Sequence, residues 1–286
     1  HGTQSATFME AIPGFKAAWH RHNASGYAFI LPALLVILCL VAYPFVMAIY
    51  LSLTDAWVGS EGNFIGFQNY SDLVQNDIFQ QTLKNSLVFT FFSVTAKTVL
   101  GMALALLLNA KIRFQRIFRG AILLPWVIPD TMSTLGWLWM FDPTFSVLNW
   151  VLTHAGLIQT NVSWLSNPYW AMFSIITVNV WRGLPFFAIT LLAGLVSVPQ
   201  ELYKAAHIDG AGAMRCFFRI TLPLLKPLLL IVILFSTIST ISDFNIVYIL
   251  TRGGPMNMTH LLATLSFQMG LSGGRLGLGA AVSLFM

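Results

Sequence analysis

The chain has 286 residues, of which 57% are hydrophobic and only 9% are charged. A soluble domain needs more charge on its surface, so this composition excludes an ordinary water-soluble protein. The formal net charge is +5, but the basic residues gather in short loops beside apolar runs, where they are typical of topology signals. We therefore expect an integral membrane protein that does not bind nucleic acid.

Six apolar runs are candidate membrane helices, because a helix needs about 20 residues to cross the hydrocarbon core. The last run is too short to span alone, so we expect the final helix to be truncated here and the complete gene product to continue past Met286. The runs predict an all-α integral membrane fold with six helices. They cover residues 27–53, 86–108, 120–141, 169–195, 222–250 and 277–286.

Lysine and arginine alternate between the two sides of the predicted membrane domain. They are concentrated before the first run, in the loop near residues 110–119 and in the loop 196–222, whereas the opposite loops carry half of the acidic residues. Basic loops stay in the cytoplasm. We therefore expect residues 1–25 to form a cytoplasmic tail, and residues 26–286 to form one transmembrane domain with a cytoplasmic N-terminus.

The cytoplasmic loop has the features of a folded platform. Ser197 and Gln200 match a capping box, and Pro199 then falls in the first helical turn. Gly210 predicts the end of this helix, and a second short helix that contains Phe217 should follow it. These residues alone leave two interpretations, a docking surface for a cytoplasmic partner and a helix that lies on lipid.

Four segments in chain order then indicate a family. The loop reads KAAHIDGA at residues 204–211 and ITLP at residues 220–223, which resembles the EAA loop of bacterial ATP-binding cassette importer permeases. Residues 64–70, 124–129 and 248–255 resemble further motifs of the carbohydrate, maltose-type branch. The resemblance covers nearly the whole chain and implies a six-helix permease core in the bacterial inner membrane.

In that family the loop contains a coupling helix that sits in a cleft of an ATP-hydrolysing subunit. The resemblance assigns the contact with the ATPase to residues of this loop. One of them departs from the family pattern, because Lys204 stands where the family has glutamate. Glu201 lies one turn earlier on nearly the same face and could replace it, or the contact is weak in this subunit. The coupling residues are Glu201, Lys204, Ala205, Ala206, Asp209 and Gly210.

The chain itself is expected to be a transport subunit and not an enzyme. No P-loop pattern, Gly-x-x-x-x-Gly-Lys followed by Ser or Thr, occurs in the sequence, so ATP and Mg²⁺ are expected to bind to a separate ATPase. The resemblance implies two ATPase subunits, a second homologous permease and an extracytoplasmic substrate-binding protein. Cys39 and Cys216 have no metal-ligand pattern near them, and we expect neither a cofactor nor a metal in this chain.

Four ionisable residues fall inside or near the predicted spans, where a charge at the centre costs about 2.5–3.5 kcal/mol. One interpretation is a set of ion pairs that lock the helices together, for instance Asp130 with Lys97 or with Arg182. The other is a polar cavity for a substrate. The two cations leave an anionic sugar open as the substrate, but Asp130 and Asp243 balance them.

The resemblance to maltose-type permeases implies which residues contact a sugar. Positions 236, 239, 240 and 243 also recur at intervals of three and four residues, which places them on one helix face. The hydroxyl groups among them could instead bond back to helix carbonyls. The expected contact residues are Trp126, Asp130, Gly183, Phe186, Ser236, Ser239, Thr240 and Asp243.

The leading hypothesis is a sugar importer permease driven by ATP hydrolysis in partner subunits. The alternative is an ion- or proton-coupled secondary carrier that uses Asp130, Asp243 and Lys97 as coupling groups. Such carriers often contain internal repeats, and none is evident between the two halves of this chain. An intramembrane enzyme would need a nucleophile–base or metal-ligand constellation, which the sequence lacks.

Overall fold

The computed structural model describes residues 29–60, 62–110 and 113–286, so the expected tail at residues 1–25 lies outside the described residues. Helices are the only extended regular elements in these ranges. They are η1 (Leu38–Ala42), α3 (Tyr43–Ser52), α4 (Gln68–Gln75), α5 (Asp77–Asn109), α6 (Gln115–Ala121), α7 (Leu124–Val127), α8 (Asp130–Met140), α9 (Val147–His154), α10 (Pro168–Ser197), α11 (Gln200–Ile208), α12 (Ala213–Cys216), η2 (Phe217–Thr221), α13 (Leu222–Ile241), α14 (Asn245–Leu250), α15 (Leu262–Phe267), η3 (Gln268–Ser272) and α16 (Leu276–Ser283).

The prediction of an all-α membrane fold is confirmed. Within the described residues, 4 helical stretches are long and apolar enough to cross a membrane, and they match the first, second, fourth and fifth predicted runs. The total of six spans and the cytoplasmic N-terminus stay predictions. The stretches are Phe29–Ser52, Asp77–Asn109, Pro168–Ser197 and Ala213–Leu250.

The expected single helix over residues 120–141 is wrong, because the run is divided into the separate helices α6, α7 and α8. Proline explains the second break. Ile128 has an extended ψ of 131°, as expected for a residue that precedes a proline, and Pro129 ends the short helix α7. The break exposes the start of α8, where Asp130 occupies the first helical position.

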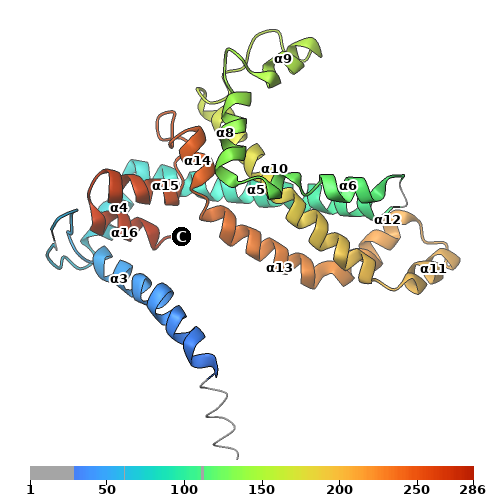
Figure 1. Ribbon diagram of the computed structural model, residues 1–286, viewed down its shortest axis with the longest axis horizontal. Coiled ribbons are helices and arrows are strands. Elements are labelled where there is room, and N and C mark those ends of the chain that lie inside the picture. The colour runs from blue at the N-terminus through green and yellow to red at the C-terminus, as the bar shows by residue number, and fades with distance from the viewer. Residues whose placement is uncertain (1–28, 61, 111–112) are drawn as a thin grey trace, which may run out of the picture.

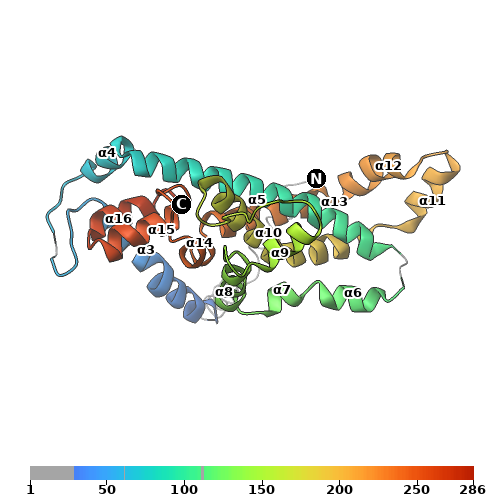
Figure 2. The same ribbon diagram turned by 90° about the horizontal axis from the view of Figure 1, so that it is seen from above.

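The helices α5 and α10 pack along each other at the centre of the molecule, and α13 runs beside them (Figures 1 and 2). Each of the two begins at an asparagine cap: the side chain of Asn76 accepts a bond from Phe79 N, and that of Asn167 accepts one from Tyr169 N. Gly101 of α5 lies against Phe187 of α10 so closely that a Cβ at position 101 would overlap Cβ of Phe187. This glycine therefore permits the close approach of the two helices.

The loop that is predicted to be cytoplasmic folds into two helices, α11 and α12, as expected, but the capping box is wrong. Ser197 is still the last residue of α10 and its hydroxyl donates to the carbonyl of Gly194 (2.7 Å). Pro199 is the N-cap of α11 and lies outside the first turn. Gly210 has a positive φ of +76°, which confirms it as the residue that ends α11. Downstream, α12 continues through η2 into α13 without a gap.

Candidate functional site

A polar cavity of about 190 Å³ lies where α5, α10 and α13 meet α7. All of the predicted contact and intramembrane residues line it except Asp130 and Asp243, which both bond to the lining residue Arg182. The structure therefore brings the whole predicted set together at one place. The lining residues are Lys97, Trp126, Asn179, Arg182, Gly183, Phe186, Phe187, Phe235, Ser236, Ser239 and Thr240.

Arg182 of α10 connects two acidic residues from different elements. Its Nη1 donates to Oδ1 of Asp130, and its Nη2 lies 2.6 Å from Oδ2 of Asp243. The same Asp243 oxygen accepts a bond from Nδ2 of Asn179 (2.8 Å), and the second oxygen of Asp130 accepts one from Nδ2 of Asn245 (2.9 Å). The ion-pair interpretation is thus present in the structure, and it coexists with the cavity.

Lys97 of α5 has a different kind of environment. Its side chain is buried, with 4% of the residue exposed, and its Nζ donates to Oδ1 of Asn179 (2.9 Å) and to Oγ1 of Thr240 (2.8 Å). Of the two pairings considered for Asp130, the structure contains the one with Arg182 and not the one with Lys97. The amide of Asn179 therefore links Lys97 to Asp243 without a direct ion pair.

Aromatic side chains form another wall of the cavity. The ring centroids of Trp126 and Phe186 are 5.9 Å apart, and those of Phe186 and Phe235 are 5.3 Å apart. Trp126 belongs to the short helix α7, so the break at Pro129 places this indole beside α10. Aromatic faces next to charged and hydroxyl groups give the cavity both apolar and polar surfaces.

The hydroxyl groups of α13 divide into two kinds. Ser236 and Thr240 are buried, and Thr240 accepts a bond from Lys97. Ser239 also lines the cavity, but its hydroxyl donates to the carbonyl of Phe235 (2.9 Å). The hydroxyl of Ser239 thus donates its hydrogen to its own helix, and the lone pairs of the oxygen remain able to accept a hydrogen bond.

Sequence reasoning missed two amides of the site, Asn179 and Asn245. Asn179 stands three residues before Arg182 and four before Gly183, which is the spacing of one helix face and could have identified it. Asn245 follows the end of α13, where the helical period stops. Its contact with Asp130 depends on the break between α7 and α8 and had no signal in the sequence.

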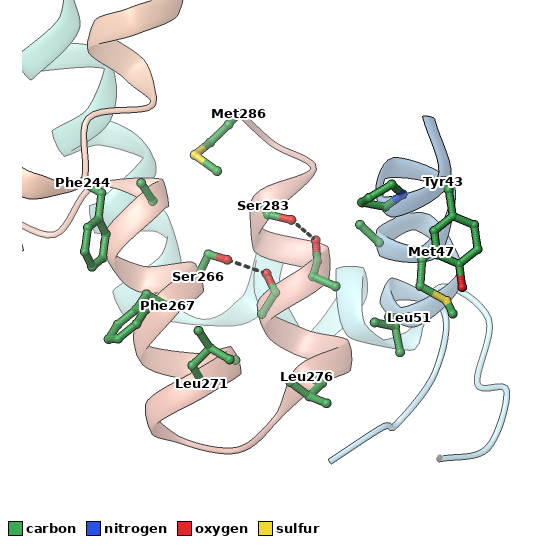
Figure 3. A pocket seen from close by; sticks show the side chains of 16 residues that line it. Tyr43, Met47, Leu51, Phe244, Ser266, Phe267, Leu271, Leu276, Ser283 and Met286 are labelled. Carbon is green, nitrogen blue, oxygen red and sulfur yellow. Dashed lines mark hydrogen bonds between the residues drawn. The ribbon is translucent and has the colours of Figure 1, made fainter. Parts of the chain in front are cut away.

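A larger groove lies elsewhere and is mostly apolar. It measures about 680 Å³ and is lined by α3 and by the hairpin of α15 and α16 (Figure 3). The hydroxyl groups of its two serines are already used, since Ser266 donates to the carbonyl of Gly279 and Ser283 donates to that of Ala280. A site that selects a polar ligand needs convergent polar groups, so the smaller cavity is the better candidate.

The predicted coupling residues lie on α11 and in the turn that follows it, at the end of the molecule far from α15 and α16 (Figure 1). All are exposed except Ala206, which is half-buried; the exposed set is Glu201, Lys204, Ala205, Asp209 and Gly210. The hydroxyl of Tyr203 lies 2.9 Å from Oγ1 of Thr221 and joins α11 to η2, which leads into α13. Of the two aromatic residues nearby, Phe217 packs into the core and Phe218 is exposed.

Comparisons with known proteins agree with these features. The description "binding-protein-dependent transport system inner membrane component" matches residues 97–286. The trehalose/maltose transport system permease protein MalF of Thermococcus litoralis is 36% identical over 93% of this chain and 89% of its own length. The sulfoquinovosyl glycerol transport system permease protein SmoG of Agrobacterium fabrum is 36% identical over 89% of this chain and 83% of its own.

A solved structure shows the same fold. It is a bacterial ABC transporter involved in the import of the acidic polysaccharide alginate, with a TM-score of 0.79 and 23% identity over 94% of this chain and 92% of the matched chain. The family resemblance and the location in the inner membrane are therefore confirmed. This chain belongs to the family of binding-protein-dependent transport system inner membrane components.

Proposed function

We propose that this chain is the membrane-spanning subunit of an ATP-driven importer that moves a sugar or oligosaccharide into the cytoplasm by alternating access. The cavity between α5, α10 and α13 carries the proposal, because it combines hydroxyl, amide and charged groups with an aromatic wall. Such a surface complements a sugar, which has hydroxyl groups around its edge and apolar faces. The relatives are named as permeases for trehalose/maltose and sulfoquinovosyl glycerol.

The partners follow from the same family. An extracytoplasmic binding protein would deliver the sugar, a second homologous permease would complete the passage, and two ATPase subunits would bind ATP and Mg²⁺. The exposed residues of α11 are the proposed contact with an ATPase. The hydrogen bond between Tyr203 and Thr221 gives that contact a direct connection to α13, which lines the cavity.

A secondary carrier is less compatible with the site. A coupling carboxylate must be able to gain and lose an ion or a proton, whereas Asp130 and Asp243 both bond to Arg182. The pair with Asp243 is the buried one, and removing one partner from a buried ion pair costs about 3–5 kcal/mol. Membership in a binding-protein-dependent transport family also favours ATP-driven import.

A matched pair of serines tests the cavity as the sugar site. Ser239 and Ser242 are both exposed and both bond back to the carbonyl four residues earlier, but only Ser239 lines the cavity. The complex is purified with each Ser→Leu variant, and the bound sugar is identified by mass spectrometry. Ser239→Leu should lose the sugar and Ser242→Leu should keep it; retention by an intact Ser239→Leu complex would contradict the proposal.

A further inference from the structure

The ionised side chains that line the cavity all have the same sign. Lys97 and Arg182 reach it, and no acidic residue is among the described residues that line it. Asp130 and Asp243 do not line the cavity, and both bond to the guanidinium of Arg182. The four charges sum to zero across the network, but the surface that a ligand meets is cationic.

The two acids also differ in their exposure to solvent. The side chain of Asp130 is 32% exposed, whereas that of Asp243 is 2% exposed. Water can therefore screen Asp130, and only Asp243 remains as a fully buried anion beside two buried or half-buried cations. The buried part of the site consequently carries an excess of positive charge.

Lys97 is the source of this excess. Its ammonium group has three donor hydrogens, and two of them go to neutral oxygens, those of Asn179 and Thr240. Within the described residues, no carboxylate lies within ion-pair distance of its Nζ. A buried cation usually has an anionic partner, and Lys97 can obtain one only from the cavity side.

Gly183 keeps Lys97 in this position. A Cβ added at residue 183 would lie 2.6 Å from Cδ of Lys97 and 3.5 Å from its Nζ. A side chain at position 183 would therefore displace the side chain of Lys97. The absence of a side chain at Gly183 is what allows the ammonium group to line the cavity.

We propose that the sugar bound in this cavity carries an oxyanion, as in a uronic acid or a sulfonated sugar, and that Lys97 is the residue that selects it. This inference rests on the proposed function and specifies its substrate class. The volume of about 190 Å³ is smaller than the roughly 300–1,000 Å³ of sites for drug-sized molecules, which suits a single acidic sugar ring. The third hydrogen of Lys97 is donated to that oxyanion.

Equilibrium binding to the purified complex tests the proposal. The probes are three radiolabelled hexuronates, those of glucose, mannose and galactose, each compared with its neutral parent hexose. At least one hexuronate should bind roughly ten- to hundredfold more tightly than its parent, as expected for a hydrogen bond to a charged group. Lys97→Met should remove this preference, and Lys97→Arg should retain part of it.

The control is Lys84→Met, because Lys84 is an exposed lysine on the same helix α5. This variant should keep the full preference for the hexuronate. Equal or tighter binding of the neutral hexoses by the wild type would overturn the inference and leave the proposed sugar import intact, as would a hexuronate preference that survives in Lys97→Met. Binding of neither class of sugar would count against the proposed function itself.

Discussion

Nη2 of Arg182 lies 2.6 Å from Oδ2 of Asp243, which joins the middle of α10 to the turn between α13 and α14. The same guanidinium bonds to Asp130 at the start of α8. One arginine thus fixes three separate elements around the cavity. A movement of α10 relative to α8 or to the α13–α14 turn must therefore break one of these bonds.

The two acidic partners of Arg182 should differ in their effect on stability. Asp243→Ala removes a buried carboxylate and leaves Arg182 and Asn179 without it, so it should lower the stability of the complex by about 3–5 kcal/mol. Asp130→Ala removes a partly exposed partner and should cost about 1 kcal/mol or less. Thermal unfolding of the purified complex measures both, and equal losses would contradict the proposed difference in burial.

Gly183→Ala should weaken substrate binding without changing any charge. The new methyl group displaces the Lys97 side chain, so the affinity for the transported sugar should fall roughly tenfold while assembly of the complex persists. Gly136→Ala is the control, because a Cβ at this position of α8 meets nothing within 4 Å. Unchanged sugar affinity in Gly183→Ala would show that Lys97 does not act in binding.

The coupling residue of α11 can be identified by two variants. Glu201 and Lys204 are both exposed on this helix. If Glu201 replaces the family's glutamate, Glu201→Ala should reduce sugar-stimulated ATP hydrolysis severalfold and Lys204→Ala should have little effect. The reverse pattern would assign the contact to Lys204, and no effect of either variant would indicate a weak contact.

Tyr203→Phe should separate ATP hydrolysis from transport. The variant removes the hydroxyl that bonds to Thr221 and keeps the ring, at a cost of about 0.5–1.5 kcal/mol. Basal ATP hydrolysis should be retained, while sugar uptake for each ATP hydrolysed should fall. An unchanged ratio of uptake to hydrolysis would show that this bond does not transmit movement.

His260, in the loop before α15, should make the stability of the folded state depend on pH. Burial lowers the pKa of His260 below its ordinary value of 6.5. The unfolded chain therefore binds the proton more readily, so the stability of the folded state falls as the pH drops below about 6.5. The melting temperature should decrease less between about pH 7.5 and about pH 5 in His260→Gln than in the wild type. His154→Gln, at an exposed histidine, should behave like the wild type.

Much of the fold followed from hydrophobic run lengths, and its failures have physical causes. The runs at 86–108 and 169–195 became the central helices because long apolar stretches have one stable arrangement in a bilayer. The prediction of a single helix over residues 120–141 was wrong because hydropathy does not show the effect of Pro129 on the backbone. The prediction of a capping box at Ser197 was wrong because α10 extends through that residue, whose hydroxyl bonds to a carbonyl of α10 itself.

The grouping of the candidate residues could be predicted where they follow a helical period, whereas their individual contacts could not. Spacing places Ser236, Ser239 and Thr240 on one face of α13, and all three line the cavity. Gly183 and Phe186 of α10 were assigned by the family resemblance. The sequence left two possible partners for Asp130, Lys97 and Arg182, and the choice between them depends on the turn of the chain at the α7–α8 break, which brings Asp130 to Arg182. The position of Lys97 between two neutral oxygens is likewise a property of three packed helices.

The most direct test is sugar uptake by the complex in sealed proteoliposomes that contain ATP inside. Wild-type complex should accumulate the sugar, and a complex with a hydrolysis-dead ATPase subunit should not, even when a proton gradient is imposed. Uptake that persists with the inactive ATPase, or that a proton gradient drives in vesicles without ATP, would contradict ATP-driven import and support a secondary carrier.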